Sequence, residues 1–219
     1  MPRPHREEER REATIRAVWA SVARFGCSGT TIERVAEIAG FSKGVIHYYF
    51  DSKQTLLLAA FEAYLQAYED ETVALLTPLG REPKAEEILD AVVEASLPEF
   101  SPSDFAAVDL PLLAPGEGLG PRYKARLFVQ FYALAMTDPD FAAAAAKVYA
   151  RQGEFFADCF AAMAPGTERE RAIARSAALV ALIDGLSFQR LLGYMPPGLS
   201  DHGELVKRFA IAPARREES

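Results

Sequence analysis

The chain has 219 residues, half of them hydrophobic, which is enough for a sizeable core in one compact unit or in a small domain followed by a larger one. Its formal charge of −7 excludes a protein that is basic throughout, but the charge is uneven. Residues 1–55 hold nine Lys or Arg against seven Asp or Glu, whereas the remaining 164 hold 15 against 24. A positive N-terminal part can bind nucleic acid while the acidic remainder stays away from it.

The cysteines and the apolar runs indicate in which cellular compartment the protein is expected. Cys27 and Cys159 are far apart and show no disulfide framework or metal-binding spacing, so we expect a reduced, cytoplasmic protein. The N-terminus is rich in Arg and Glu and lacks the apolar core of a signal peptide. No apolar run approaches the length of a membrane span, so no membrane partner is expected.

The N-terminal residues predict a tail and one helix. Residues 2–8 are expected to form a loose tail in which Arg3 and Arg6 either reach phosphate or are simply solvated. A helix is expected over residues 7–25, and Gly26 is expected to end it. Four apolar side chains form its buried stripe: Ile15, Val18, Trp19 and Val22.

Residues 30–53 contain two short helical runs separated by a glycine. The first run begins with Thr30 and has Glu33 three residues later, which is the spacing of a capping box. Gly40 can adopt the left-handed conformation that ends a helix. Apolar residues recur at helical spacing and predict one buried face: Ile32, Val35, Ala36 and Ala39.

The second run, residues 43–49, presents a different surface. Ser42 can cap this run. Ile46 and Phe50 fall on one side, where they can pack inward with Tyr49 near them. Glycine allows close approach, lysine meets phosphate or guanine, and histidine and tyrosine donate hydrogen bonds to phosphate oxygens, so the other side suits the major groove of DNA. The side chains on that outward side are Lys43, Gly44, Val45, His47 and Tyr48.

The stretch SKGVIHYYFDSK, residues 42–53, resembles the recognition helix and following turn of the tetracycline-repressor-like (TetR) family of bacterial regulators. The opening Thr30-Thr31-Ile32 and the close Tyr49-Phe50-x-Ser52-Lys53 match the same pattern. The family more often has Leu-Tyr where this chain has Ile46-His47, so a histidine replaces the tyrosine that usually contacts phosphate. A helix-turn-helix that packs on protein is the alternative. The predicted DNA-binding residues are Thr31, Ser42, Lys43, Gly44, Val45, His47, Tyr48 and Lys53.

A long helix is expected over residues 53–76, with Ser52 as its cap. Lys53 lies in the first turn, where free N–H groups and the positive end of the helix dipole attract a phosphate. Because this helix is expected to run from the DNA-binding part into the body, a ligand that tilts it would move the recognition helix. Its wide apolar face consists of Leu57, Ala60, Phe61, Tyr64, Leu65 and Tyr68.

The rest of the chain predicts a helical body. A helix over residues 167–192 is apolar over a wide arc and needs partners on two sides, which the core and a second subunit can supply. The predicted fold is all-α, with a three-helix helix-turn-helix DNA-binding domain over residues 1–51 and a helical ligand-binding and dimerisation domain over residues 52–219. The phrase ALIDGL, residues 181–186, resembles the C-terminal domain of the betaine-biosynthesis repressors of the TetR family. The other expected helices cover residues 85–97, 103–113, 122–136, 138–163 and 204–210.

Aromatic residues crowd this body, and polar residues such as Asp184 lie among them. A buried carboxylate needs a partner, which is an arginine such as Arg175 or Arg190, a backbone N–H, or a cationic ligand held with aromatic faces. The alternative is that these side chains only build the core. The candidate ligand-binding residues are Phe61, Tyr64, Tyr68, Phe105, Asp109, Phe128, Phe131, Tyr132, Gln152, Phe156, Asp184 and Phe188.

Catalysis is not expected, and neither is a metal or a cofactor. His5, His47 and His202 share no helical face that would gather them. The favoured interpretation is a cytoplasmic, homodimeric, sequence-specific DNA-binding repressor, released from its operator DNA by a small effector that is cationic or aromatic. A helix-turn-helix protein acting through protein partners, without an operator, is the second interpretation. An enzyme with its site in the acidic body is the third.

Overall fold

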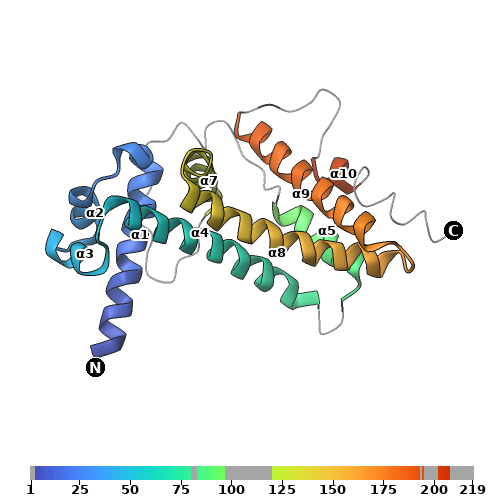
Figure 1. Ribbon diagram of the computed structural model, residues 1–219, viewed down its shortest axis with the longest axis horizontal. Helices are drawn as coiled ribbons and strands as arrows, with labels where there is room; N and C mark the ends of the chain where they lie inside the picture. Colours follow the sequence, from blue (N-terminus) through green and yellow to red (C-terminus); the bar gives the residue numbers. More distant parts are fainter. Residues whose placement is uncertain (1–2, 80–82, 97–119, 193, 195–201, 208–219) are drawn as a thin grey trace. The chain divides into compact units, whose positions relative to one another are not determined.

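A computed structural model describes residues 3–79, 83–96, 120–192, 194 and 202–207 of the chain (Figure 1). These residues form helices and no strand, which confirms the predicted all-α class. The predicted helix over residues 103–113 lies outside the described residues. In chain order the elements are α1 (Arg3–Gly29), α2 (Ile32–Ala39), α3 (Lys43–Tyr49), α4 (Lys53–Leu76), the short 3-10 helix η1 (Thr77–Leu79), α5 (Ala85–Ser96), α7 (Pro121–Ala135), α8 (Pro139–Met163), α9 (Arg169–Leu191) and α10 (His202–Val206).

The helices gather into two compact units. Unit 1 holds α1, α2, α3 and α7, together with the part of α4 up to Ala67 and the part of α8 up to Ala145. Unit 2 holds the rest of α4 and α8, together with α5, α9 and α10. The domain boundary expected after Asp51 stays a prediction.

Helix α1 begins earlier than expected. Its first residue is Arg3, so the prediction of a loose tail over residues 2–8 is wrong for the residues that the structure describes. Glutamate and arginine are strong helix formers, and an ion pair at helical spacing joins Arg16 to Glu12 at 2.8 Å. Gly26 interrupts the helix as expected, with φ of 72° and ψ of 171°, and the chain turns helical again up to Gly29.

The cap of α2 lies one residue later than the predicted capping box. Thr31 is the N-cap, and its hydroxyl accepts the N–H of Arg34 at 3.2 Å. Thr30 is fully buried instead. Its hydroxyl donates to the Gly26 carbonyl at 2.9 Å and lies 3.0 Å from the Ser21 hydroxyl, so it joins α1 to α2. The prediction that Thr30 caps the helix is therefore wrong.

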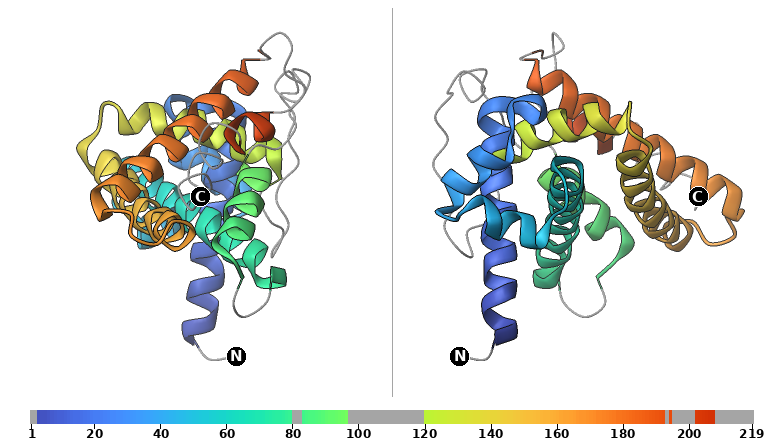
Figure 2. Two further views of the ribbon diagram at one scale, coloured as in Figure 1. Left: turned by 90° about the vertical axis from the view of Figure 1, so that its right-hand side faces the viewer. Right: turned by 60° about the vertical axis from the view of Figure 1, so that its left-hand side comes forward.

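A tight turn connects α2 to α3, and both helices lie beside α1 (Figure 2). Gly40 adopts the left-handed conformation, with φ of 69° and ψ of 28°, as predicted. The N–H of Phe41 then reaches back to the Ala36 carbonyl at 2.9 Å and closes the end of α2. These three helices form the predicted helix-turn-helix arrangement.

Each unit has its own core. In unit 1, the fully buried ring of Phe61 lies 5.2 Å from Phe131 and 5.6 Å from Phe141, measured between ring centroids. The indole N–H of Trp19 donates to the Ala60 carbonyl at 2.8 Å and fastens α1 to α4. The core of unit 2 is built mainly from α5, α8 and α9, and its largest fully buried side chains are Leu89, Phe160 and Leu179.

Helix α9 is more apolar than the sequence suggested. An 18-residue window within Arg169–Gln189 has a mean hydropathy of 1.3, which meets the length and composition of a membrane span. The expectation that no run approaches such a span is therefore wrong. A helix covered by another subunit passes the same test, and only 28% of this window is buried within the chain. Ile173 and Phe188 of α9 are exposed in this chain, where a partner can cover them.

Candidate nucleic-acid interface

Helix α3 divides its side chains as the sequence predicted. Ile46 is fully buried and Phe50 is 5% exposed, so this side packs into unit 1. Tyr48 is 72% exposed, a large exposure for an aromatic ring. Val45 is half-buried, which makes it the least outward of the predicted set. The other outward residues are all exposed: Ser42, Lys43, Gly44 and His47.

An ion pair that the sequence did not reveal holds the lysine of α3. The Lys43 ammonium lies 2.6 Å from the Glu33 carboxylate of α2. The hydrogen bond from Lys43 is the main cause that lowers the pKa of Glu33 to about 2. Both side chains are more than half exposed, so solvent screens the pair and DNA phosphates can compete for the lysine. A capping box starting at Thr30 would have turned the Glu33 carboxylate back to the start of α2. Because Thr31 is the cap instead, Glu33 is available to pair with Lys43.

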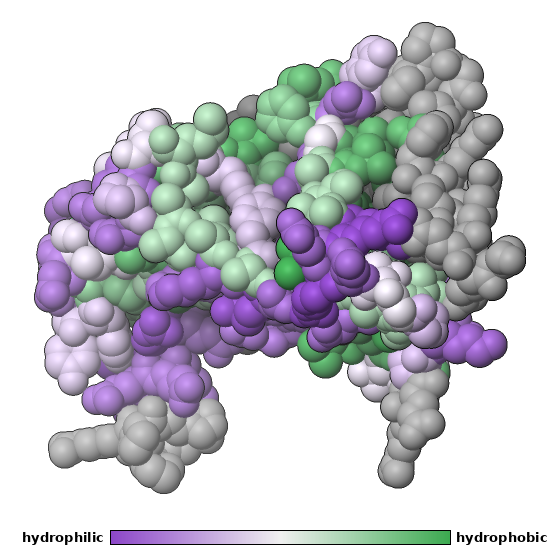
Figure 3. Space-filling model, turned by 45° about the vertical axis from the view of Figure 1, so that its right-hand side comes forward, coloured by the Kyte–Doolittle hydropathy of each residue, from purple (hydrophilic) through white to green (hydrophobic). Residues whose placement is uncertain are grey.

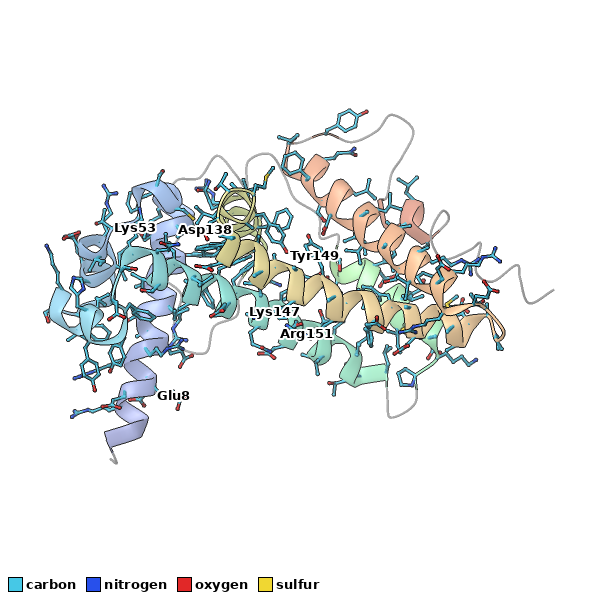
Figure 4. All side chains as sticks on the ribbon, viewed as in Figure 1. Glu8, Lys53, Asp138, Lys147, Tyr149 and Arg151 are labelled. Atoms are coloured by element: carbon cyan, nitrogen blue, oxygen red, sulfur yellow. The ribbon has the colours of Figure 1, made fainter. Side chains whose placement is uncertain are left out.

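The predicted phosphate contacts at the start of α4 are partly engaged within the protein. The Lys53 ammonium, in the first turn of α4 (Figure 4), donates to the Ser28 carbonyl at 3.0 Å. An ammonium has three donors, so this bond leaves two for a ligand. The Ser52 hydroxyl accepts the N–H of Thr55 at 3.1 Å, which confirms the predicted cap. Thr31 is half-buried, and its hydroxyl is occupied as the cap of α2.

Helix α7 is tied to the kinked end of α1. The Gln130 side-chain oxygen accepts the N–H of Cys27 at 3.0 Å, directly after the Gly26 kink. The Arg126 guanidinium donates to the Ala23 carbonyl at 2.8 Å. Burial is the main cause that raises the pKa of the Cys27 thiol to about 11, so the thiol stays protonated at neutral pH. No motif in the sequence predicts the contact of Gln130 with Cys27, which joins residues 103 positions apart.

The aromatic candidates of unit 1 pack against one another. Phe61 contacts Tyr64 at 6.5 Å and Tyr132 at 5.9 Å between ring centroids, and Phe128 lies 4.4 Å from Tyr132. Phe131 completes the cluster and is fully buried. Ring-to-ring contact of this kind is typical of a core, and the assignment of these residues to a ligand stays a prediction. Phe105 and Asp109 lie outside the described residues.

The candidates of unit 2 include a polar cluster. The Tyr149 hydroxyl of α8 donates to the Asp184 carboxylate of α9 at 2.6 Å (Figure 4 labels Tyr149). Burial raises the pKa of Asp184, and the hydrogen bond from Tyr149 partly offsets that rise. The Tyr68 hydroxyl lies 3.3 Å from the Ser96 hydroxyl, and the pKa of Tyr68 is raised by burial, with the charge of Asp184 as a smaller cause. The Ser187 hydroxyl donates to the Ser96 carbonyl at 3.4 Å.

Tyr149 is a partner for Asp184 that the sequence did not identify. The remaining candidates of unit 2 differ in exposure: Phe156 is buried in the core, Gln152 is half-buried and Phe188 is 50% exposed. Among the described residues, no group of three His, Cys, Asp or Glu side chains could hold a metal ion.

Two family models match the chain. Residues 15–60 match the model described as "Bacterial regulatory proteins, tetR family". Residues 110–210 match the model described as "BetI-type transcriptional repressor, C-terminal". The first match covers the helix-turn-helix and the start of α4, and the second covers the region of α7, α8 and α9.

Curated relatives point the same way. The HTH-type transcriptional regulator BetI of Agrobacterium fabrum is 33% identical over 109 residues, which are 49% of this chain and 52% of that protein. The BetI of Stenotrophomonas maltophilia is 30% identical over 44% of this chain and 48% of its own length. The matches to these two relatives thus span about half of each protein. The BetI of Cronobacter sakazakii is 25% identical over the whole of both chains.

Solved structures share the fold. A transcriptional regulator from Rhodococcus sp. Rha1 has a TM-score of 0.69 at 21% identity, covering 94% of this chain and 97% of that one. A regulator from Saccharomonospora viridis, solved in complex with choline, has a TM-score of 0.70 at 23% identity, covering 92% and 95%. The helix-turn-helix and the C-terminal region each match their family model, so the chain belongs to the TetR family of bacterial transcriptional regulators, with a C-terminal region of the BetI repressor type.

Proposed function

We propose that the protein is a homodimeric repressor that binds a specific operator through α3 and leaves it when a small organic cation binds in unit 2. The observation that carries the DNA-binding part is the two-sided character of α3. Its inward side is buried, and its outward side offers a lysine, a glycine, a histidine and a tyrosine to a ligand. Those groups suit the edges of bases and the phosphates of a major groove. The protein would act in the cytoplasm, where operator DNA lies.

Gly44 provides the sharpest test of that proposal. A Cβ at this position would meet only the Ser42 hydroxyl oxygen, at the ordinary contact distance of 3.8 Å, so a side chain can begin there without a clash, and Gly44 is exposed. Gly44→Glu would place bulk and negative charge against DNA and is expected to abolish the operator gel shift. Gly44→Ala, the matched control, adds one methyl group and should bind far better. A Gly44→Glu protein that shifts its operator like the wild type would show that α3 is not the reader.

The dimer part of the proposal rests on α8 and α9. Apolar side chains reach the surface of the molecule, as the face drawn in Figure 3 illustrates. Phe155 of α8 and Ile173 of α9 are 39% and 42% exposed, and Phe188 of α9 is 50% exposed, so both helices present large apolar side chains to solvent. A second copy that packs α8 and α9 against its own would cover them. A two-fold dimer reads a palindrome whose half-sites lie about one DNA turn, or a multiple, apart.

The effector part rests on Asp184. Its carboxylate is partly buried, and Tyr149 is the one neighbour found to donate to it among the described residues. A quaternary ammonium would bring the missing positive charge and would also suit the tyrosine rings nearby. Choline, bound in the Saccharomonospora viridis regulator, is therefore the first compound to test. An uncharged isostere with carbon in place of nitrogen should bind much more weakly.

The switch is proposed to run through α4. This helix is continuous from Lys53 to Tyr68, and 15 residues of helix measure about 22 Å. Coupling between two such sites is typically about 1–3 kcal/mol, or 5- to 150-fold in affinity, and it is reciprocal. Calorimetry of choline with and without bound operator is the test. Equal affinities in both titrations would mean that the cation binds without acting as an inducer.

A further inference from the structure

A groove lies beside α3, and its second wall comes from the N-terminal half of α1. The groove has a volume of about 350 Å³. Glu7 and Arg10 line it from α1, and Gly44, Val45 and Tyr48 are among the residues that line it from α3. We call it the α1–α3 groove. Its α3 side is the same surface that the proposed function places against DNA.

The Arg10 guanidinium is free to bind an anion. Its side chain is exposed. No ion pair or side-chain hydrogen bond to its guanidinium is found in the described part of the chain. The next residue differs, because the Arg11 guanidinium lies over the Phe50 ring at 5.9 Å from its centroid. Two neighbouring arginines of one helix thus have different surroundings, and only Arg10 lines the groove.

We infer that the α1–α3 groove receives the sugar-phosphate backbone of the bound DNA, with Arg10 as the phosphate-binding residue. The inference rests on the proposed function, because it takes α3 to lie in the major groove. A helix in that position has phosphate strands on both sides. A strand on the side of α1 would pass between the two walls of the groove. The planar fork of an arginine can then donate two parallel hydrogen bonds to phosphate oxygens.

Glu7 places a negative charge in the same groove, one turn before Arg10. A carboxylate repels a phosphate, so Glu7 should limit the affinity that Arg10 supplies. Removing the charge of Arg10 should therefore lower the affinity for DNA, and removing the charge of Glu7 should raise it. Both precede residue 15, where the match to the TetR-family model begins, so they belong to a part of α1 that the model does not match.

The experiment measures fluorescence anisotropy of the full-length protein with its operator and with an unrelated duplex, over a range of salt. Arg10→Gln should weaken binding to both duplexes by the same factor, and Glu7→Gln should strengthen both. Each phosphate contact contributes about 0.9 to the salt slope, so a dimer loses about 1.8. The ratio of wild-type to Arg10→Gln affinity should then fall about twelvefold between roughly 50 and 200 mM salt.

Matched controls come from the same helix. Arg11→Gln and Glu8→Gln remove the same charges outside the groove and should have much smaller effects; Glu8 is labelled in Figure 4. Unchanged binding by both groove variants, with a wild type that binds DNA, would overturn the inference alone. So would a change in base preference with Arg10→Gln. A wild type that binds no DNA at all would refute the proposed function and this inference together.

Discussion

The contact between Gln130 and the kinked end of α1 makes a quantitative prediction. Gln130→Ala removes the oxygen that accepts the N–H of Cys27 at 3.0 Å, in a partly buried position. Leaving such a donor without a partner costs about 1–3 kcal/mol of folding free energy. For a chain of this size, each kcal/mol lowers the melting temperature by about 2–4 °C. Thermal and urea unfolding followed by circular dichroism would measure the change.

Gly26 allows a double-mutant cycle on the same contact. A Cβ at Gly26 would lie 2.8 Å from the Gln130 side-chain oxygen, and φ of 72° is strained for any other residue. Gly26→Ala should therefore be destabilising, and less so when Gln130 is already alanine, because only the backbone strain of about 1–3 kcal/mol then remains. Val129→Ala, one residue earlier on α7 and 38% exposed, is the control. An unchanged midpoint for Gln130→Ala, or strictly additive costs in the cycle, would refute this account of the contact.

Three further predictions concern the DNA contact, the charge in unit 2 and the dimer. Lys53→Ala should weaken binding to all DNA sequences alike and lower the salt slope by roughly one per subunit, whereas an altered base preference would make Lys53 a base reader. Burial raises the pKa of Asp184 above its usual 3.8, so the folded state holds a proton that the unfolded state has released, and this stabilisation is present at low pH and lost as pH rises through the raised value. Asp184→Asn should therefore remove part of the loss of unfolding free energy as pH rises above 3.8, and an unchanged pH profile would contradict the assignment. Ile173→Arg should turn the dimer into monomers in light scattering, whereas Val73→Arg, at a position 65% exposed on α4, should not. If both variants stay dimeric, the interface lies elsewhere.

Ile173 is a better probe of the interface than Val180, although both are apolar residues of α9, seven positions apart. Val180 is only half-buried but packs against the core of unit 2, so a charge there would also disturb the fold. Ile173 is 42% exposed, and a charge at this position meets solvent in the monomer. Periodicity alone could not separate them, because the exposed and the core-facing rows of α9 are both apolar.

Local signals in the sequence predicted the helices well. The expected bounds of the helix over residues 53–76 agree with α4, since Ser52 caps its start and a Pro- and Gly-containing stretch follows its end. The orientation of α3 was also predictable, because Ile46 and Phe50 are its obvious inward residues. Gly40 was identified by its place between two short helical runs. Each of these signals lies within a few residues of the feature that it specifies.

The sequence-based predictions failed where a contact between residues far apart in the chain determines the role of a side chain. Two adjacent threonines precede α2, and burial of Thr30 against Ser21 makes Thr31 the cap. The sequence offered no means of choosing between them. The partner of Asp184 is 35 residues away, and the Gln130 contact spans 103 residues. Such pairs depend on how helices pack, which hydrophobic periodicity does not specify.

The aromatic candidates illustrate the same limit for the site. The sequence correctly marked Phe61 and Phe131 as apolar positions of the body, but it could not say whether a ring meets another ring or a ligand. In unit 1 the rings meet one another. The polar cluster around Asp184 depends on the hydrogen bond from Tyr149. No sequence motif predicts this role, because a single tyrosine in a helix can lie in a core, at the surface or in a site. Arg10 was missed for a different reason: it lies in the helix expected over residues 7–25, where no motif distinguishes it from the neighbouring arginines.

The central claim is that α3 of this protein reads a specific DNA sequence. Genome-wide sequencing of DNA fragments captured by the purified protein tests it most directly, with the Gly44→Glu variant as the parallel control. The account predicts a small set of enriched fragments that share a palindrome with half-sites about one DNA turn, or a multiple, apart, and no enrichment with the variant. Capture without any shared sequence, or the same enriched sites with Gly44→Glu, would contradict the claim.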